Sequence, residues 1–490
     1  MHHPRLPVLP LRQTGPLVEP LGWGTEHESE PPRALRSLGK IIDDDLCHRC
    51  GSCVGICPTN VLGLDNDDYP VVKNLSACTD CDLCVKVCPG DEFSVPSIAK
   101  QLFATLPDIH DMHGHFKQAF LAYAMDPQVR AGSTSGGLVS GLLISLLERH
   151  EIDGAIVIAS DPQQLWKGRP MVARTREDVM SAMKSKYAIS PTNAALSEVI
   201  DVPGRYALVG LPCQIHGFHK AARLNRKIKE RVTLTIGLFC HAAVEHEPMR
   251  TIWQNLGSAK DDAVRFVSRV GKHPGTPHLV HRDGSTTPVY FPRARGYRPS
   301  SLEILNILYR LYTPPRCLTC YDSTAEFADI AVGDPWMAPP DDRINFLEGY
   351  SFALGRTDAG LSALRQGEGT ESLKLVEITA EHARSSNRMM GVEKRNRAFR
   401  VIETRRRQGH AIPDYGLVLP KVRKRELLKT EINMLSHLFC FFTPGRKTLL
   451  QFTFSAVGYQ LLRLNFFKRR FREWRRDTSA QLRRRVTVRS

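Results

Sequence analysis

Thirteen cysteines are spread along this 490-residue chain, and eight of them form two copies of one pattern. Each copy reads C-x2-C-x2-C-x3-C-P, and the second begins 31 residues after the first. Thiolates are soft ligands that suit zinc or iron–sulfur clusters. Three of them within seven residues, with small residues such as Gly51 and Ser52 between them, predict a loop wrapped around such a centre.

The spacing is that of a two-cluster bacterial-type ferredoxin, in which the fourth cysteine of each copy serves the other cluster. The first [4Fe–4S] cluster is therefore predicted to bind Cys47, Cys50, Cys53 and Cys88, and the second Cys78, Cys81, Cys84 and Cys57. A zinc knuckle has no use for a third cysteine at the next step or for the C-P ending. Disulfides would imply a secreted chain, and the first residues show no apolar signal-peptide core.

Composition and charge describe a globular body with a basic end. The chain is 42% apolar and 24% charged, which is ordinary for a soluble protein. Its net charge is +16, but residues 391–490 alone contain 25 Lys and Arg against 7 Asp and Glu. Such an asymmetry is typical of an interaction tail.

Pattern changes divide the chain into segments. Residues 1–40 contain seven prolines and no sustained period, which indicates a mobile leader, and residues 41–98 contain the cysteine repeat. Beyond residue 118, short apolar runs alternate with amphipathic stretches, as in an α/β layer. The expected strands are Gln118–Met125, Gly154–Ser160, Arg205–Gly210, Val232–Phe239, Asp329–Gly333 and Tyr350–Gly355, with a hairpin at His278–Tyr290. The expected helices are Leu138–Arg149, Glu177–Met183, Gln214–Asn225 and Ala359–Arg365.

The last hundred residues combine basic and apolar segments. Lys421–Leu428 and Phe467–Arg476 are dense in Lys and Arg, and Thr448–Leu462 is largely apolar. The apolar run is too short to span a bilayer. It fits an interfacial segment at a membrane, or a face that packs on the body while the arginines are solvated.

Two further segments can bind an anion. Gly132-Ser-Thr-Ser-Gly-Gly137 precedes a helix-like run, where free N–H groups and the helix dipole attract phosphate. Lys184-Ser-Lys-Tyr187 adds two cations, a hydroxyl and an aromatic ring. Either segment alone is as consistent with a solvated loop.

The remaining motifs follow in a fixed order. They are Leu211-Pro-Cys213-Gln214, Leu238-Phe-Cys240-His241, Cys317-Leu-Thr-Cys320-Tyr-Asp322 and Ala328-Asp-Ile-Ala-Val-Gly-Asp334. Together with the Ser/Gly and Lys/Tyr segments, this order resembles the family of coenzyme F(420) hydrogenase/dehydrogenase beta subunits. Relatives include 7-hydroxymethyl-chlorophyll a reductase and a ferredoxin-dependent divinyl-chlorophyllide reductase. The resemblance covers about residues 78–355.

The resemblance implies an α+β or α/β multidomain flavoenzyme that binds FAD. The implied units are a flavin-binding N-terminal-type part at 110–235, a C-terminal-type part at 236–390 and a basic extension at 391–490. The implied flavin-binding residues are Ser133, Ser135, Gly136, Gly137, Lys184, Ser185, Lys186 and Tyr187.

The resemblance also groups Cys213, Cys240, Cys317 and Cys320 as ligands of a third [4Fe–4S] cluster. Cys213 and Cys240 could instead be buried small side chains, and the C-x2-C pair a redox pair or half a zinc site. Cys440 lies outside every motif and is expected to be an inert thiol. The family's frequent Cys-His-Gly is here Cys240-His-Ala-Ala243, which removes a glycine that would permit a close backbone approach.

These expectations describe a cytoplasmic iron–sulfur flavoprotein oxidoreductase. Reduced ferredoxin or a reduced deazaflavin is the expected donor and an organic substrate the acceptor, with His241, His216 and Tyr187 as candidate proton donors. One alternative is an electron-transfer subunit of a hydrogenase or dehydrogenase complex. Another is a non-catalytic iron–sulfur protein whose basic tail binds the inner membrane face or, with no supporting motif, nucleic acid.

Overall fold

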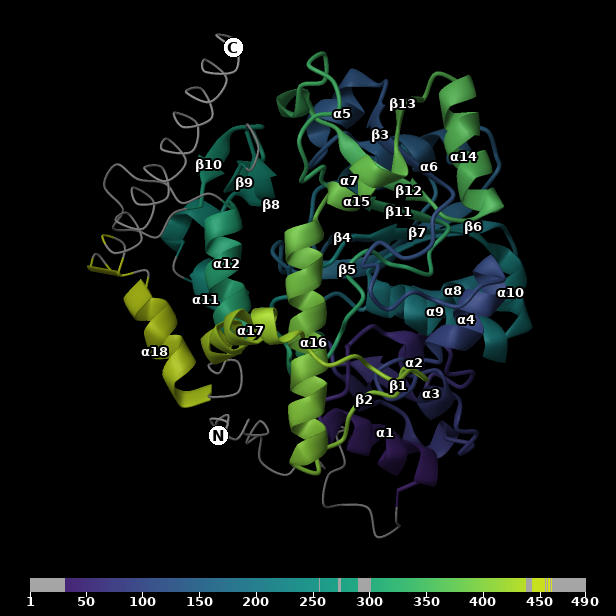
Figure 1. The fold of residues 1–490 in the computed structure, drawn as a ribbon, viewed down its shortest axis with the longest axis vertical. Helices are drawn as coiled ribbons and strands as arrows, with labels where there is room; N and C mark the ends of the chain where they lie inside the picture. The colour runs from purple at the N-terminus through teal and green to yellow at the C-terminus, as the bar shows by residue number, and fades with distance from the viewer. Residues whose placement is uncertain are drawn as a thin grey trace.

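The computed structural model describes residues 31–460 apart from 255, 272–274, 290–300, 438–442, 454, 456 and 459. Its centre is one mixed sheet of eight strands, in the order β13-β3-β12-β11-β7-β6-β4-β5 (Figure 1). The strands are β3 Gln118–Ala124, β4 Gly154–Ser160, β5 Gly168–Ala173, β6 Tyr206–Gly210, β7 Val232–Leu238, β11 Ile330–Gly333, β12 Ser351–Gly355 and β13 Leu373–Ile378. The mixed α/β class predicted from the sequence is confirmed.

Four consecutive strands, β11, β7, β6 and β4, pair in parallel, and the remaining strands pair antiparallel with their neighbours. Strands β4, β6, β7 and β11 run in one direction, and β3 shares it because β12 is antiparallel to both β11 and β3. Their near-continuous apolar sequences are buried on both faces, as parallel strands require. The carboxyl ends of β3, β6, β7 and β11 therefore meet at the same edge of the sheet.

Helices cover both faces of this sheet. On one face the apolar sides of three helices pack against Phe120, Val157 and Ile236. These helices are α6 Leu138–Glu148, α7 Arg176–Ala182 and α14 Asp358–Gly369. On the other face the sheet packs on α8 Leu196–Asp201, α9 Pro212–Leu224, α10 Arg226–Arg231 and parts of α4 and α16. Short elements at the edges are α5 Pro127–Gly132, η2 Thr192–Ala195, α13 Pro315–Leu318, η4 Phe346–Glu348 and α15 Ala380–Ser385.

The cysteine repeat forms a small module below the sheet in Figure 1. Its two halves match, because helices α2 and α3 begin at equivalent positions of the two copies, 31 residues apart. The elements are α1 Arg33–Asp43, α2 Ser52–Gly55, β1 Leu62–Leu64, β2 Pro70–Val72, η1 Leu75–Ala77, α3 Leu83–Lys86 and α4 Val95–Phe103. Strands β1 and β2 pair antiparallel.

A three-stranded sheet lies beside the large sheet, at the upper left of Figure 1. Its order is β10-β9-β8, and β9 and β10 form the hairpin predicted at His278–Tyr290, whose last residue lies outside the described residues. The elements here are α11 His246–Gln254, η3 Gly257–Lys260, β8 Ala263–Val270, β9 Thr276–His281, β10 Thr286–Pro288 and α12 Ser301–Tyr312. Helices α11 and α12 pack on it through one apolar cluster.

The predicted end of the mobile leader at residue 40 is wrong. Helix α1 begins at Arg33, inside the segment 1–40 that we expected to be mobile. Its buried residues are Ala34, Leu35, Leu38, Ile41 and Ile42, which is helical spacing. We did not recognise this short helical period because prolines precede it. Residues 1–30 lie outside the described part of the chain.

The two later domain boundaries fall inside elements. The division at 235/236 cuts β7, whose sheet includes strands from both predicted parts. The division at 390/391 cuts α16 Arg388–Arg407, the long central helix of Figure 1. Lys394, Arg395, Arg397 and Arg405 of this helix are buried, so the first basic residues of the predicted extension belong to the body.

Two more helices follow α16. They are α17 Lys424–Ser436 and α18 Thr443–Thr453. The predicted interfacial segment Thr448–Leu462 begins within α18, where Leu450 is buried in the α11–α12 cluster and Leu449 packs against it. This part packs on the body, which is the second of the two alternatives. Residues 461–490 lie outside the described residues, and within the described ones no helix is long and apolar enough to cross a membrane.

Candidate electron-transfer site

The two cysteine loops of the module have the same backbone conformation. Arg49 and Gly51 in the first copy, and Asp80 and Asp82 at the equivalent positions of the second, are all left-handed, with φ between 51° and 84°. Left-handed residues between the cysteines turn the chain tightly. Each loop then enters a one-turn helix that carries the third cysteine of its copy.

The loops bring together the cysteines predicted for each cluster. The thiol of Cys53 is close enough to those of Cys47, Cys50 and Cys88 that burial first, and then these neighbours, raise its pKa well above its usual value. Burial, followed by Cys57 and Cys81, raises the pKa of Cys84 to about 12. Cys78 is also among its neighbours. The cross-over of Cys88 and Cys57 between the two copies therefore agrees with the ferredoxin pattern.

This donor set fits iron–sulfur clusters. Cluster ligation needs thiolates, and iron supplies the charge compensation that these crowded, buried thiols lack. Among the described residues, no group of three or more His, Cys, Asp or Glu side chains is arranged around a single metal ion. In a [4Fe–4S] cluster each thiolate binds a different iron, so its four ligands are spread apart.

A third set of four cysteines forms at the edge of the large sheet. Cys213 lies in the first turn of α9 after β6, and Cys240 follows the end of β7. Cys317 and Cys320 come from α13 and the residues after it. Burial raises the pKa of Cys240 to about 12, and Cys317 and Cys320 add to this. The structure thus assembles all four predicted residues from three distant segments.

The third set adjoins the first. Among the thiols that raise the pKa of Cys213 beyond the effect of burial, Cys50 of the module comes first, before Cys317 and Cys240. Arg316, next to Cys317, is fully buried and donates to the carbonyl oxygens of Gly90 (3.0 Å) and Pro89 (3.3 Å). Charge-assisted bonds of this kind fix the geometry of both partners. The end of the second cysteine motif is therefore held against the helix that carries Cys317.

Buried contacts also dock the module on the rest of the chain. The Asn193 side chain donates to the Ser52 hydroxyl, and a Cβ on Gly55 would lie 2.0 Å from the Asn193 carbonyl oxygen. Arg49 forms a buried ion pair of 2.6 Å with Glu245. The module is thus packed as part of the body.

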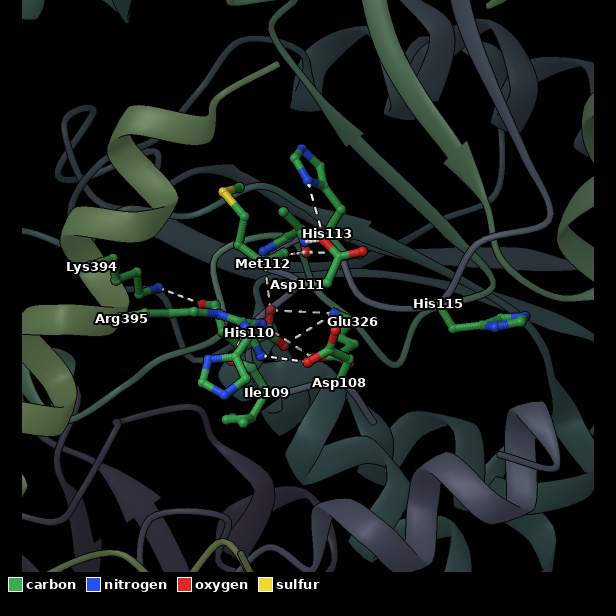
Figure 2. A network of polar contacts seen from close by, with 12 residues as sticks. Asp108, Ile109, His110, Asp111, Met112, His113, His115, Glu326, Lys394 and Arg395 are labelled. Atoms are coloured by element: carbon green, nitrogen blue, oxygen red, sulfur yellow. Dashed lines mark hydrogen bonds and ion pairs between the residues drawn. The ribbon is translucent and has the colours of Figure 1, made fainter. Parts of the chain in front are cut away.

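A buried cation lies beside the third set. The Lys394 ammonium donates to the carbonyl oxygens of Cys240 (2.7 Å) and Asp322 (2.6 Å). Burial alone would lower the pKa of Lys394, but the thiols of Cys320 and Cys240 and the Asp322 carboxylate raise it to about 12. Figure 2 shows Lys394 on α16 next to Arg395, near Glu326 and the Asp108–His115 segment. A fixed positive charge here would offset the negative charge of a cluster bound by these thiolates.

The Ser/Gly loop lies at the same edge of the sheet, after the carboxyl end of β3. Gly136 has no space for a side chain, because a Cβ would lie 2.4 Å from the carbonyl oxygen of Ala122. Gly137 is left-handed (φ 78°) and begins helix α6. The Ser135 hydroxyl contacts that of Ser351 (3.0 Å), and Ser133 donates to a backbone oxygen in α5. The loop therefore presents backbone rather than free hydroxyls.

The Lys/Tyr segment contacts this loop directly. Lys184 donates to the carbonyl oxygen of Ser133 (2.7 Å), and the Ser185 N–H donates to the Thr134 hydroxyl (3.1 Å). Lys186 donates back to the carbonyl oxygen of Met183 (3.1 Å). The two segments that the sequence proposed for one cofactor are thus brought together.

Two arginines that we did not predict complete a basic cluster here. Arg265 and Arg269 of β8 lie beside Lys184, whose pKa is lowered to about 8 by burial and then by these two arginines. Burial and Arg265 lower the pKa of Lys186 to about 7. Asp334, after the end of β11, pairs with Arg269 at 2.8 Å. Crowded, poorly solvated cations favour an anionic ligand such as a diphosphate.

An apolar pocket opens next to this basic cluster. Lys186 and Tyr187 line it, together with Trp166, Phe266 and Ile304 and other side chains of α11, α12 and the small sheet. Aromatic and aliphatic walls with a few charged groups at one side suit a planar organic ligand with a phosphorylated tail. The side chains of the pocket and the basic cluster have the chemistry that a flavin nucleotide requires.

The Lys/Tyr segment and the segment that follows Cys240 share backbone hydrogen bonds. The Val244 N–H donates to the carbonyl oxygen of Tyr187 (2.9 Å), and the Ile189 N–H donates to that of Val244 (3.0 Å). Val244 follows Cys240 by four residues, and the intervening Ala243 N–H donates to the Cys317 thiol. Alanines therefore replace the family's glycine without separating the segment from the cysteines.

The three candidate proton donors have different surroundings. His216 is buried, stacks on Phe93 and binds Asp322 at 3.1 Å, away from the pocket. Burial and then Arg397 hold the pKa of His241 well below its usual value. Of the three residues, Tyr187 alone lines the pocket.

Sequence patterns did not identify Arg265, Arg269, Arg316 and Lys394. Arg265 and Arg269 lie in a segment with no motif, Arg316 precedes a motif defined by its cysteines alone, and Lys394 lies in the part assigned to the basic tail. A signal existed only for Lys394, because α16 alternates basic residues with apolar ones such as Ala398 and Ile402 at helical spacing.

Comparisons with known proteins match three segments of the chain. The model of the coenzyme F(420) hydrogenase/dehydrogenase beta subunit matches residues 119–197 with its N-terminal part and residues 204–381 with its C-terminal part. A 4Fe-4S dicluster domain matches residues 39–89. The first beta-subunit match ends at residue 197, within α8, and the second begins at residue 204, before β6, which is earlier than the division we predicted at 235/236.

Three relatives cover much of the chain. One subunit of the F(420)H(2) dehydrogenase of Methanosarcina mazei is 28% identical over 67% of this chain and 83% of its own length. The beta subunit of the coenzyme F(420) hydrogenase of Methanothermobacter thermautotrophicus is 27% identical over 52% of this chain and 82% of its own. The coenzyme F(420)-dependent sulfite reductase of Methanocaldococcus jannaschii is 27% identical over 70% of this chain, which spans only 49% of that relative.

Proposed function

Because the chain belongs to the family of coenzyme F(420) hydrogenase/dehydrogenase beta subunits and includes a 4Fe-4S dicluster domain, we propose that it is an iron–sulfur flavoprotein oxidoreductase. It exchanges electrons with a ferredoxin-like or deazaflavin partner and reduces or oxidises an organic substrate. When bound, [4Fe–4S] clusters supply one-electron and FAD two-electron redox chemistry. Relatives named for F(420) support a deazaflavin as one of the two redox partners.

In this proposal the three cysteine sets hold three clusters. The ferredoxin-type sets are those of the dicluster domain, and the third is Cys213, Cys240, Cys317 and Cys320. Lys394 neutralises part of the charge of the third set, and Arg316 holds it against Cys88-Pro89-Gly90. These residues keep the first and third sets adjacent, as short electron-transfer distances demand.

The basic cluster and the apolar pocket hold the flavin. Lys184, Lys186, Arg265 and Arg269 bind the diphosphate, and the backbone of Ser133–Gly137, which packs closely on Ala122 through Gly136, lies beside it. Ser185 holds this loop through Thr134. Tyr187 packs beside the ring in the pocket and excludes water from it.

The observation that carries the proposal is the backbone pairing between Tyr187–Ile189 and Val244. It sets the wall of the pocket a few residues from Cys240, so that a redox centre on the cysteines and an organic ring in the pocket share one short segment. The basic cluster and the apolar pocket at this place support an organic redox cofactor beside the cysteines.

Chemical analysis of anaerobically purified protein tests the proposal. Acid-released chromophore should be FAD at near one per chain, identified by fluorescence and mass, with iron and sulfide matching three clusters. Lys186→Met combined with Arg265→Met should lower the FAD content and leave iron unchanged. A brown protein that binds no flavin, even with FAD supplied, would overturn the flavoenzyme assignment.

A second candidate is an electron-transfer subunit of a larger complex. The names of two relatives, a dehydrogenase subunit and a hydrogenase subunit, favour it. It predicts chains that co-purify at fixed stoichiometry and are needed for turnover. Full activity of the isolated chain with a soluble donor and acceptor would exclude it.

A further inference from the structure

We propose that the outer face of α17 docks on an anionic lipid bilayer. We call this surface the α17 face. It consists of an apolar stripe with cationic side chains on both sides, and its residues are Lys424, Arg425, Leu428, Lys429, Ile432 and Leu435. The inference does not depend on the proposed function.

The inner side of α17 is fixed to α16, which determines what the outer side presents. Thr430 and Met434 are both 5% exposed, and His437 directly after the helix is 6% exposed. Glu431 of α17 pairs with Arg400 of α16 at 2.7 Å. Because these contacts hold one side of the helix, its exposed residues lie on the opposite side.

The outward side carries three large aliphatic residues. Leu428, Ile432 and Leu435 are 72%, 60% and 46% exposed, and their spacing of four and three places them in one line along the helix. A single exposed Leu needs no explanation, but an ordered stripe on one helix marks an interaction surface. Its burial in the acyl–headgroup boundary would remove all three from water.

Cations border the stripe on both sides. With 100° per residue, Lys424 lies on one side of the stripe and Arg425 and Lys429 on the other, and all three are exposed. The acidic residues of α17 are turned inward, since Glu426 contacts Asn396 and Glu431 contacts Arg400. The α17 face is therefore positive around an apolar centre, which complements anionic headgroups over an acyl layer.

Other occupants fit this surface less well. Nucleic acid would bind the cations through phosphates, but an aliphatic stripe adds nothing to such binding. The chain's own residues 461–490 contain 11 Lys and Arg against 2 Asp and Glu, so they share the charge of the α17 face. A bilayer satisfies the stripe and the cations together.

Sedimentation of the full-length holoprotein with vesicles tests the proposal. The protein should bind vesicles of equal parts phosphatidylcholine and phosphatidylglycerol and not vesicles of phosphatidylcholine alone. The combined variant L428S/I432S/L435S and the combined variant K424E/R425E/K429E should each weaken binding by about tenfold or more. L428W, which adds an interfacial aromatic ring, should strengthen binding.

A matched control uses apolar residues equally exposed elsewhere. Leu106 and Leu347 are 71% and 65% exposed outside α17, so the variant L106S/L347S should bind vesicles as the wild type does. Iron content and the visible spectrum verify that every variant is folded. Retained vesicle binding in the serine variant, with loss only in the glutamate variant, would identify a general polyanion site and overturn the proposal. Failure of the wild type to bind anionic vesicles would overturn it as well.

Discussion

Each ferredoxin-type loop contains its cysteines within eleven residues, from Cys47 to Cys57 and from Cys78 to Cys88, whereas the third set draws on residues 213, 240, 317 and 320. In the loops, left-handed residues such as Arg49 and Asp80 bend the chain locally around the cysteines. In the third set, two cysteines follow parallel strands and two lie around a one-turn helix. The same donor chemistry is thus built once from local geometry and once from the register of a sheet.

The two kinds of site also differ in what surrounds them. The second module set has Cys81 exposed to solvent, whereas the first set lies beside the buried Arg49 and is near Arg316. The third set lies against a buried ammonium, Lys394, and a buried guanidinium, Arg316. Because buried positive charges raise the reduction potential of nearby clusters, a third cluster would differ in potential from a cluster on the second module set.

The largest expected effect is a loss of iron and sulfide that distinguishes the third cysteine set from the module. The variant C213S/C240S should lose one of three equal shares of iron and sulfide, because serine oxygen is a poor substitute for thiolate. The ferredoxin-type EPR signals should remain. C81S, in the module, should instead alter the module signals. Iron content unchanged in C213S/C240S would show that the third set holds no cluster and end the comparison.

The next largest expected effect is a loss of stability when the contact between the module and the rest of the chain is broken. Glu245→Gln leaves the buried Arg49 guanidinium without its carboxylate, which should lower the free energy of unfolding by about 3–5 kcal/mol. Lys40→Met, in the exposed pair with Asp44, should change it by less than about 0.5 kcal/mol. Urea denaturation under anaerobic conditions measures both. Equal, small effects would mean that the module is only loosely attached.

A smaller steric change tests the same contact without altering charge. In Gly55→Ala the new Cβ would meet the Asn193 carbonyl oxygen, 2.0 Å away, which should cost about 1–3 kcal/mol as the module shifts. Gly369→Ala, late in helix α14 with nothing within 4 Å, should be neutral or stabilising by up to about 1 kcal/mol. A Gly55→Ala protein as stable as Gly369→Ala would show that the loop yields freely.

The sequence predicted the local features well. The repeat identified all eight module cysteines, and the apolar runs located β3, β4, β6, β7, β11 and β12 within one or two residues. Both signals are short-range, because a strand of a parallel sheet is a run of buried residues and a cluster loop is a spacing. The family comparison confirmed the predicted resemblance, and with it the dicluster module.

Features that depend on distant contacts were missed. Strand β13 reads LKLVEI and carries exposed polar residues, so only its pairing with β3 reveals it. Lys394 looked like part of a basic tail because its burial depends on α16 crossing the molecule. Arg265 and Arg269 reach the Lys/Tyr segment from the small sheet, and no pattern in one sequence brings β8 and Lys184 together.

The smallest expected effect is a pH dependence of the basic cluster. The module cysteines should not show it. The pKa of Lys186 is about 7 and that of Lys184 about 8, both below the usual value for lysine, through burial and through Arg265, with Arg269 also acting on Lys184. Across the range between these values and about pH 10 the unfolded chain binds more protons, so stability without a ligand should rise with pH.

Anion binding should show the opposite trend. A bound diphosphate favours the protonated lysines, so the affinity of the flavin-free protein for inorganic pyrophosphate should fall by about tenfold or more between about pH 6 and about pH 9. Arg269, held by Asp334, and Tyr187 also face this cluster and keep their charge states over most of that range. Lys186→Met should flatten the profile, while Lys100→Met, exposed on α4, should leave it unchanged. Calorimetric titration at several pH values measures this. An affinity independent of pH in the wild type would mean that the lysines stay protonated throughout, and that the cluster is solvated as freely as the surface of the module.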